Sequence, residues 1–569
     1  MITIKKYMLI GLIVNVKNFI MKDILIVFFI ILFSIPVILV FLPYLTQPKT
    51  VLTYDWDYFS QMYEAFRVSV IKYGQFPWFN PWVAGGVPLY ANPQFGLVSI
   101  QAVLVLIFGT LVGLKLSVIL YALLAMWGIY CLLRYNNTPV SRSLMLGYIF
   151  VFGGFGVYHI TGGHLTFAVY YLIPFLLWSF QRLLKESKWI IFSVIFSLCL
   201  LSASHYIILQ FMLILFGISI LAVWKKPYGK NFKELAIIYL KSFGLILILS
   251  AHKIFFAYQY LASYPRLGGD ANSVSILTLS KSLIIPPSPY NHTQPAGLNY
   301  SWGEYSAYSG IILIFITIFI FIVLFNNKKL ITNKIYVVFL IIIGSFLLAL
   351  GRFSKFSPFN LLGELPVYKS MIAPARWMGW LFFGIILLIG LIKLNKRQEK
   401  IVGLLLVVSV LEITFFTVPY IRFMNPNIKY SVPNIINNKF EQYDDYKKDE
   451  YMRYFSGTKA NYGEVRGYEA ILDYNLYRPT NRCGINKGCG LVLTNNASID
   501  YWSPNKIIVS RNQPGEIKLN INPGSYWLVN GKRIWPNDKV VVLTKDFTLN
   551  DNQNKYELLI SPSLSLGPQ

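Results

Sequence analysis

The sequence predicts an α-helical polytopic membrane protein with about eleven transmembrane helices and a C-terminal β-rich domain outside the membrane. Three observations support this class. Of the 569 residues, 55% are hydrophobic and only 13% are charged, about half the charged share of a soluble globular protein. Apolar runs long enough to cross a bilayer recur as far as residue 419. Beyond it, Asn, Lys, Asp and Pro become frequent and short strand-like runs appear.

The spans follow from apolar length and from the position of basic residues. The net charge of +26 comes largely from Lys and Arg in short loops, which favours membrane topology over nucleic-acid binding. We predict crossings at residues 24–43, 112–133, 143–160, 165–181, 189–204, 206–223, 234–255, 307–325, 335–350, 377–392 and 401–419. This arrangement puts every basic cluster on one side, which we expect to be the cytoplasmic side of a bacterial-type inner membrane.

Two apolar stretches, the first span and residues 98–110, differ from the other predicted spans. The first span is too long for a cleaved signal peptide, so we expect a retained anchor. Residues 98–110 are interpreted as re-entrant or interfacial, because a further full crossing would invert every later loop. The N-terminus is then cytoplasmic, and the chain after residue 419 is external or periplasmic.

We therefore predict two domains. Residues 1–419 form the transmembrane domain, with a large first outer loop at 44–97, and residues 420–569 form the external domain. Strand-like runs occur at 506–509, 516–521, 526–529, 539–543 and 556–560. Asn530-Gly531 between two of them is a strong hairpin signal.

The four cysteines divide between the two predicted domains. Cys131 and Cys199 fall in spans, where a thiol acts as a small apolar group. Cys483 and Cys489 lie in the external "NRCGINKGCG", where an oxidising compartment would permit a short disulfide. A zinc site there is disfavoured, because two cysteines without a nearby His make half a site at most.

The first outer loop begins with a predicted helix from Asp55 onward, which places Asp57, Gln61 and Glu64 on one face and aromatic residues on the other. One interpretation is an amphipathic interfacial helix with a solvated acidic face. The other is a functional carboxylate site at the outer membrane surface, with Gln61 and Glu64 as candidate substrate-binding residues.

The next segment, residues 73–94, is rich in proline, glycine and aromatic residues, which predicts an ordered but non-helical loop. It could rest at the headgroup level as an aromatic belt. Alternatively, its rings could stack on sugars while amides bind their hydroxyls. The candidate substrate-binding residues here are Trp78, Asn80, Trp82, Asn92 and Gln94.

The order of five segments resembles the YfhO-like multipass family, which is similar to the GT-C glycosyltransferase superfamily. The segments are the acidic motif after the first span, "YGQFPWFNPWVAGGVPLYANPQ", "GGHLTFAVYYLIPFLLW", "GEYSAYSG" and "APARWMGW". The later "NPGSYWLVNGKRI" is similar to the family's closing hairpin but departs from its usual Pro-Gly-Trp pattern.

The resemblance implies a GT-C-type glycosyltransferase that takes a sugar from a polyprenyl-phosphate donor and passes it to a cell-envelope glycan or lipid acceptor on the outer face. It further implies that a carboxylate of the first outer loop is the general base. Asp57, in a D-x-x-x-Q relation to Gln61, is preferred narrowly over Asp55, which lies nearer the first span. One base without an enzyme nucleophile predicts inversion at the anomeric carbon.

A leaving phosphate calls for cationic groups near the outer interface. Arg376 is the first candidate, because Arg binds phosphate in a bidentate manner, although an Arg near a span end also commonly snorkels to the interface. The other candidates are Arg352, Arg266, Lys253 and His252.

His159, His164 and His205 lie in outer turns without close ligand spacing, so a bound metal is the less favoured interpretation. We expect His164 to be a substrate contact or a satisfied turn residue. Glu304 is a second acidic candidate, for acceptor hydroxyls or for a divalent ion held with the first-loop aspartates. The sequence requires no cofactor, although a divalent metal is compatible with it.

Two rival functions are a transporter or flippase of a lipid-linked glycan, and a membrane-anchored glycan-binding protein. A transporter should carry charged or helix-breaking residues at mid-span in related halves, whereas the sequence has few charges at mid-span and no convincing internal repeat. A binding protein would explain the external domain but not the first-loop acids.

Overall fold

The computed structural model describes residues 34–42, 46, 55–203, 205–225, 230–263, 273–288, 300–365, 368, 371, 373–424, 439–443, 452–464, 490–522, 526–533, 541–543 and 555–561. Within the first predicted span only residues 34–42 are described, and they are helical. Arg266, Cys483 and Cys489 lie outside the described residues, so the predicted disulfide stays a prediction.

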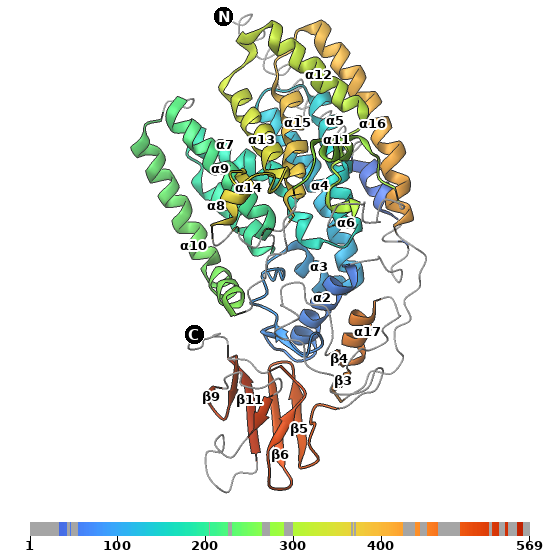
Figure 1. Ribbon diagram of the computed structural model, residues 1–569, viewed down its shortest axis with the longest axis vertical. Coiled ribbons are helices and arrows are strands. Elements are labelled where there is room, and N and C mark those ends of the chain that lie inside the picture. The colour runs from blue at the N-terminus through green and yellow to red at the C-terminus, as the bar shows by residue number, and fades with distance from the viewer. Residues whose placement is uncertain are drawn as a thin grey trace, which may run out of the picture.

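Of the described residues 66% are helical, and a small β-rich C-terminal region lies at one end of the helices (Figure 1). The α-helices are α2 Trp56–Ile71, α3 Ile100–Phe108, α4 Thr110–Tyr135, α5 Val140–Phe152, α6 Gly154–Thr161, α7 Ile173–Glu186, α8 Trp189–Leu201, α9 His205–Lys225, α10 Phe232–Ser263, α11 Ile276–Ile284, α12 Ile311–Asn326, α13 Asn333–Ala349, α14 Pro358–Gly363, α15 Met378–Leu391, α16 Lys396–Phe423 and α17 Arg453–Ala460. Short 3₁₀ helices are η1 Leu165–Leu172, η3 Trp302–Glu304, η4 Lys328–Leu330 and η5 Pro374–Trp377.

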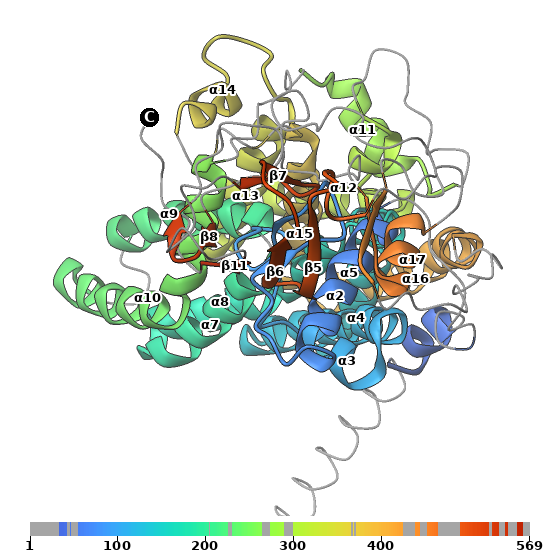
Figure 2. The same ribbon diagram turned by 90° about the horizontal axis from the view of Figure 1, so that it is seen from below.

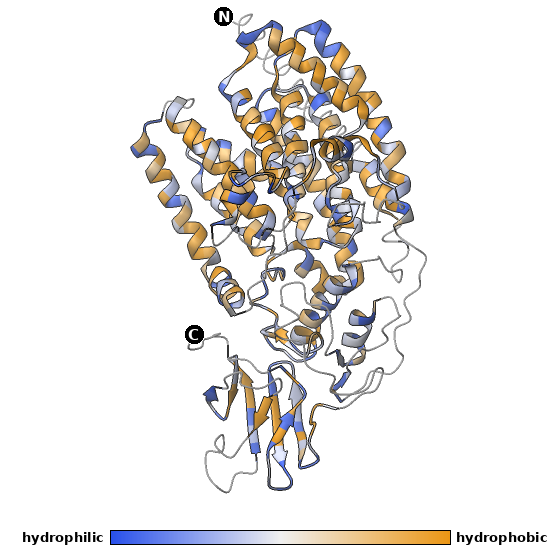
Figure 3. Cartoon of the chain, in the orientation of Figure 1, coloured by the Kyte–Doolittle hydropathy of each residue, from blue (hydrophilic) through white to orange (hydrophobic). Residues whose placement is uncertain are grey.

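Among the described residues, seven helical stretches are long and apolar enough to cross a membrane. They are Thr110–Tyr135, Val140–Thr161, Leu165–Glu186, His205–Trp224, Phe232–Ala262, Pro374–Leu391 and Lys396–Arg422, and each coincides with a predicted span. Three shorter apolar helices, α8, α12 and α13, coincide with three more. Hydrophobic residues cover most of these helices, as Figure 3 shows.

Burial separates central from peripheral helices. An apolar 18-residue stretch of Val140–Thr161 is 100% buried, and the corresponding stretch of Pro374–Leu391 is 89% buried. The corresponding stretch of Phe232–Ala262 is only 28% buried. A helix that is apolar all round and buried all round lies in the core of a helical bundle. The helices α5, α6 and α15 therefore form the centre, and α10 lies at the edge, where its apolar residues can face lipid.

The segment predicted not to cross is a short helix. α3 has nine residues, which extend for about 14 Å, less than half of a bilayer's hydrocarbon core. Gly109 ends it in a left-handed conformation (φ +82°), and α4 starts at the next residue. This reversal is typical of a re-entrant or interfacial segment.

The C-terminal strands are β3 Glu441–Tyr443, β4 Tyr462–Glu464, β5 Ala497–Ser503, β6 Lys506–Arg511, β7 Ile517–Leu519, β8 Trp527–Val529, β9 Lys532–Arg533, β10 Val541–Leu543 and β11 Lys555–Ile560. Five of them form a sheet in the order β5-β6-β11-β8-β9. All five predicted strand runs are confirmed, while β3, β4, β5 and β9 were not expected. Asn530 and Gly531 both have positive φ (50° and 80°), as the two-residue turn between β8 and β9 requires.

The described part of the predicted first outer loop, residues 55–97, lies between the helix bundle and the C-terminal sheet (Figures 1 and 2). It contains α2 and a short hairpin whose two strands, β1 Phe79–Asn80 and β2 Val87–Pro88, have two residues each. Backbone hydrogen bonds join it to the C-terminal region, from Gly85 N to Glu464 O (3.0 Å) and from Asn522 N to Gly85 O (2.8 Å). The C-terminal region is thus docked on the loop by main-chain contacts.

Candidate active site

Four charged side chains from distant parts of the sequence meet at the outer-loop end of the bundle. Asp55 precedes α2, His164 lies between α6 and η1, Glu304 ends η3, and Arg376 lies in η5. His164 Nε2 is 3.2 Å from Asp55 Oδ2 and 3.8 Å from Glu304 Oε1. Arg376 binds Glu304 in a bidentate manner, with Nε and Nη2 each 2.8 Å from a carboxylate oxygen. We refer to these four residues as the charged cluster.

The turn after α6 holds Asp55 in position. The Asp55 backbone N–H donates to Gly162 O (3.2 Å), and the Trp56 indole donates to Ile160 O (2.9 Å). Gly163 has φ +88°, and a Cβ there would lie 2.2 Å from Trp56 N. Only glycine fits this close approach, which explains why the "GGH" sequence brings Asp55 and His164 together.

Arg376 is held from two sides. Its guanidinium lies 5.0 Å from the Phe167 ring centre and 4.6 Å from that of Tyr206, in addition to its pair with Glu304. The side chains of Arg376 and Glu304 are only 12% and 11% exposed. The arginine therefore does not snorkel toward solvent but forms a largely buried ion pair.

The positive and negative groups of the charged cluster stabilise one another's charged forms. Burial alone would lower the pKa of His164, but the carboxylates of Glu304 and Asp55 together raise that pKa above its ordinary value. Burial would raise the pKa of Glu304, but Arg376 and His164 hold it well below its usual range. Asp55 is the most exposed of the four at 36%, so it is the carboxylate that a substrate can reach.

Asp57, the base preferred from sequence, has a different environment. Its two oxygens accept the backbone N–H groups of Tyr454 (3.2 Å) and Phe455 (2.9 Å) at the start of α17. Burial raises the pKa of Asp57 to about 6, against the lowering effect of these hydrogen bonds and of Arg453. Asp57 therefore anchors the C-terminal region, whereas Asp55 contacts His164 and is 36% exposed.

The polar face of α2 is not solvated, which corrects one of the two interpretations of this helix. Gln61 is fully buried and donates to Asn80 Oδ1 (3.0 Å) and Thr458 Oγ1 (3.1 Å). Glu64 is also buried, and it accepts a hydrogen bond from the Thr110 hydroxyl of α4. These side chains join the first outer loop to its neighbours.

The side chains of residues 73–94, called the aromatic loop here, are also mostly buried. Trp82 is buried and donates to Asn461 Oδ1 (3.1 Å), and Asn92 is buried, with its side-chain oxygen accepting from Gln94 N (2.8 Å). Trp78 and Gln94 are only partly buried, and Trp78 packs against Tyr90. Of the loop candidates, Trp78 and Gln94 are the ones with surface available to a ligand.

The remaining basic candidates do not join the charged cluster. Lys253 is buried and donates to the backbone oxygens of Tyr90 (2.6 Å) and Asn92 (2.9 Å), so it holds the aromatic loop. His252 contacts the Tyr90 hydroxyl. Arg352 is exposed beyond the end of α13. Arg376 is thus the phosphate candidate that the described residues bring to the cluster.

A metal could be held by His159, His164 and Glu304, whose ligand atoms lie within 4.8 Å of one another. Imidazole nitrogen and carboxylate oxygen are donors that suit zinc. However, His159 Nδ1 and His164 Nδ1 are hydrogen-bonded at 2.8 Å, and Arg376 binds both oxygens of Glu304. Metal binding would have to displace these contacts. His205 is not part of this group.

Sequence reasoning missed Phe167 and Tyr206, which frame Arg376. Phe167 lies in the "GGHLTF" segment, so an aromatic residue three positions after His164 was a readable signal. No signal in the sequence marked Tyr206, because its approach to Arg376 depends on how α9 packs against η1.

These features define a class of protein: a largely helical chain with membrane-type helices, a small β-rich C-terminal region and a charged cluster at the end near that region. No family model matches the sequence, and no curated protein is significantly similar to it. The function must therefore be argued from the residues themselves.

Proposed function

We propose that the chain is a membrane glycosyltransferase that moves a sugar from a polyprenyl-phosphate donor to a cell-envelope glycan or lipid acceptor. One observation carries the proposal: an accessible carboxylate, Asp55, adjoins His164 and the buried Glu304–Arg376 pair where the first outer loop meets the helix ends. A lipid-linked donor presents its phosphate at the level of the lipid headgroups, so a carboxylate that reacts with it must lie at the same depth.

The proposed topology places this cluster on the outer face. The seven long helices, the three shorter apolar helices and the first predicted span give the eleven crossings of a GT-C-like arrangement. The N-terminus is then cytoplasmic, and the C-terminal region lies outside a bacterial-type inner membrane.

In the proposed reaction, Asp55 accepts the proton of the acceptor hydroxyl as its oxygen attacks the anomeric carbon. The bond from that carbon to the phosphate oxygen breaks, and its electron pair leaves with the carrier phosphate. His164 and Arg376 supply positive charge beside the reacting groups. The pair with Glu304 uses two of the five N–H donors of Arg376, so the guanidinium retains donors for phosphate. A single displacement inverts the anomeric centre.

The test is sugar transfer by the purified full chain in lipid nanodiscs, with a panel of radiolabelled polyprenyl-phosphate sugars and cell-envelope acceptors. We expect Asp55→Asn to lower turnover by about 100- to 10,000-fold, the usual contribution of a general base, while donor binding is retained. Asp57→Asn is the matched control, because it removes a carboxylate two residues away that already caps α17. It should retain turnover per folded molecule.

Two results would contradict the proposal. Full transfer by Asp55→Asn would remove the base from the mechanism. No transfer by the wild type from any donor would favour the transporter, which a lipid-linked glycan flipping assay would then test.

A further inference from the structure

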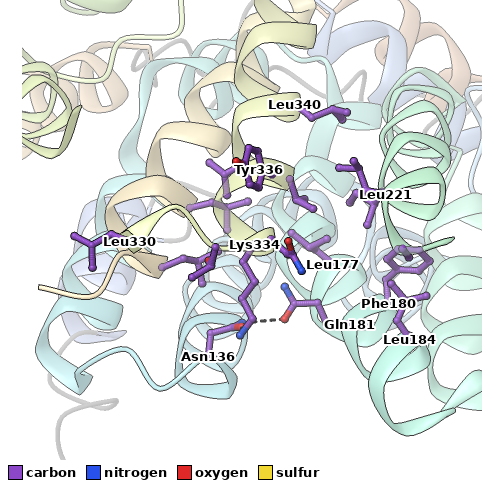
Figure 4. Close-up of a pocket in the computed structure, with 18 of the residues that line it drawn as sticks. Asn136, Leu177, Phe180, Gln181, Leu184, Leu221, Leu330, Lys334, Tyr336 and Leu340 are labelled. Atoms are coloured by element: carbon purple, nitrogen blue, oxygen red, sulfur yellow. Dashed lines mark hydrogen bonds between the residues drawn. The ribbon is translucent and has the colours of Figure 1, made fainter. Parts of the chain in front are cut away.

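A cavity of about 780 Å³ lies far from the charged cluster, between α7, α9, α13 and the ends of α4 and α15 (Figure 4). Its wall is apolar along Leu177, Phe180, Leu221 and Leu340, and polar where Asn136, Gln181 and Lys334 meet. Figure 4 shows Lys334 extending toward Asn136 and Gln181, with Leu221 and Leu340 at the other end. The cavity therefore has a polar head and an apolar body.

The contacts at the two ends of α4 show at which end of the molecule the cavity lies. Its first residue, Thr110, contacts Glu64 in the first outer loop, whereas Asn136, which follows its last residue, lines the cavity. The 26 residues of α4 extend for about 39 Å, which exceeds the hydrocarbon thickness of a bilayer. The cavity thus opens at the opposite membrane surface from the charged cluster.

The polar head is positively charged. Lys329, Lys334 and Lys393 line the cavity, and no acidic residue is among the described residues that do. Lys185 and Lys393 lie close enough to Lys334 for their charges to repel one another. The nearby Glu186 is already engaged by Arg182 (3.0 Å). Such a group of ammonium ions attracts an anion.

The cavity is open to a ligand from the membrane. Trp224 and Tyr336 line it and are 70% and 51% exposed, and such amphipathic rings typically sit at the level of lipid headgroups. The Lys334 ammonium donates to Asn136 Oδ1 (2.6 Å). An ammonium has three N–H donors, so the contact positions Lys334 and leaves it able to bind an anion.

We propose that this cavity binds an anionic glycerophospholipid, with its phosphate on Lys334 and Lys393 and an acyl chain along the apolar wall between α9 and α13. The positive charge favours an anionic headgroup, and the apolar wall favours a lipid over a soluble phosphate. The site does not depend on the proposed transferase activity, because it lies at the other membrane surface.

The test is native mass spectrometry of the full chain in mixed micelles that contain equal amounts of phosphatidylglycerol and phosphatidylcholine. We expect the wild type to retain phosphatidylglycerol preferentially. The double variant Lys334→Gln/Lys393→Gln should bind it at least about tenfold more weakly, since each lysine near a membrane surface contributes roughly a fivefold attraction to anionic lipid. The matched control is Lys233→Gln/Lys400→Gln, which removes two exposed lysines outside the cavity.

Equal retention of both lipids by the wild type, or equal loss in the two double variants, would overturn the proposal. A third arm adds polyprenyl phosphate: if it displaces phosphatidylglycerol at equal concentration, the cavity is a carrier site instead. The melting temperature of each variant checks its folding, and if the double variant unfolds, the two single variants decide the outcome.

Discussion

At the scale of single residues, Asp55 and Asp57 show how two neighbouring carboxylates take different roles. Residues two apart near a helix start are separated by about 200° around its axis. Asp55 accordingly faces the turn after α6, and Asp57 faces α17. The sequence presented both as acids of one motif, but Asp55 contacts His164 while Asp57 binds the backbone of α17.

The raised pKa of His164 gives a prediction about pH. A histidine whose pKa is raised on folding contributes stability that is fully present below the ordinary value of 6.5 and is lost as the pH rises through the raised pKa. We expect His164→Gln to destabilise the protein by about 1 to 3 kcal/mol at pH 5.5, the usual range for hydrogen bonds to charged groups. The difference should shrink toward pH 9.

The measurement is the thermal midpoint of both proteins across this pH range. His252→Gln, at an exposed position outside the cluster, serves as the control. A deficit that stays constant with pH would mean that His164 contributes packing rather than charge.

Asp57 gives a second pH prediction. Its pKa of about 6 is above the unfolded value of 3.8, so its protonated form is favoured by folding. That stability is present below about pH 4 and is lost as the pH rises through 6. Asp57→Asn should remove this part of the pH dependence, which we expect to be about 1 to 3 kcal/mol.

Hydrogen exchange of the Tyr454 and Phe455 amides between pH 4 and 7, corrected for intrinsic rates, reports the same contact directly. In the wild type their protection should fall as the pH rises. If Asp57→Asn shows the same fall, another group controls the docking of α17.

At the scale of elements, the turn between α6 and η1 is the part of the site most sensitive to a small change. Gly163 meets the start of α2 so closely that a Cβ would lie 2.2 Å from Trp56 N and 2.6 Å from Asp55 C. Since both are backbone atoms, they can move only if α2 moves as a whole.

We predict that Gly163→Ala displaces Asp55 from His164, and so lowers both stability and sugar transfer. Gly74→Ala is the matched control, because Gly74 also has positive φ (+60°) but open space around its added Cβ. It should cost only about 1 to 2 kcal/mol of backbone strain. Thermal midpoints and turnover of both variants test this, and equal effects would show that strain alone matters at Gly163.

At the scale of the whole molecule, the start of α16 and the end of α12 lie at the opposite end of the helices from the C-terminal sheet (Figure 1). We predict that a cysteine at position 510 in β6 reacts with a membrane-impermeant maleimide in intact cells. A cysteine at position 400, at the start of α16, should react only after permeabilisation. Cys483 and Cys489 must first be replaced by serine, because we expect them on the outer side too. Labelling of position 400 in intact cells would reverse the proposed orientation.

The sequence by itself determined the positions of the long apolar helices, of five C-terminal strands and of the Asn530-Gly531 turn. Each of these depends on local properties, namely apolar length, alternation and the backbone preference of a few residues. Asp55, His164, Glu304 and Arg376 were separate candidates, marked by the family resemblance and by the chemistry that it implies.

Only the tertiary structure decided which candidates meet. Asp55 and Glu304 are 249 positions apart in the sequence, yet both lie within 4 Å of His164. Likewise, the side chain of Gln61 is held by Thr458 of α17, nearly 400 positions later. Such contacts depend on how whole helices pack, and packing is set by the combined surface of many residues rather than by any one motif.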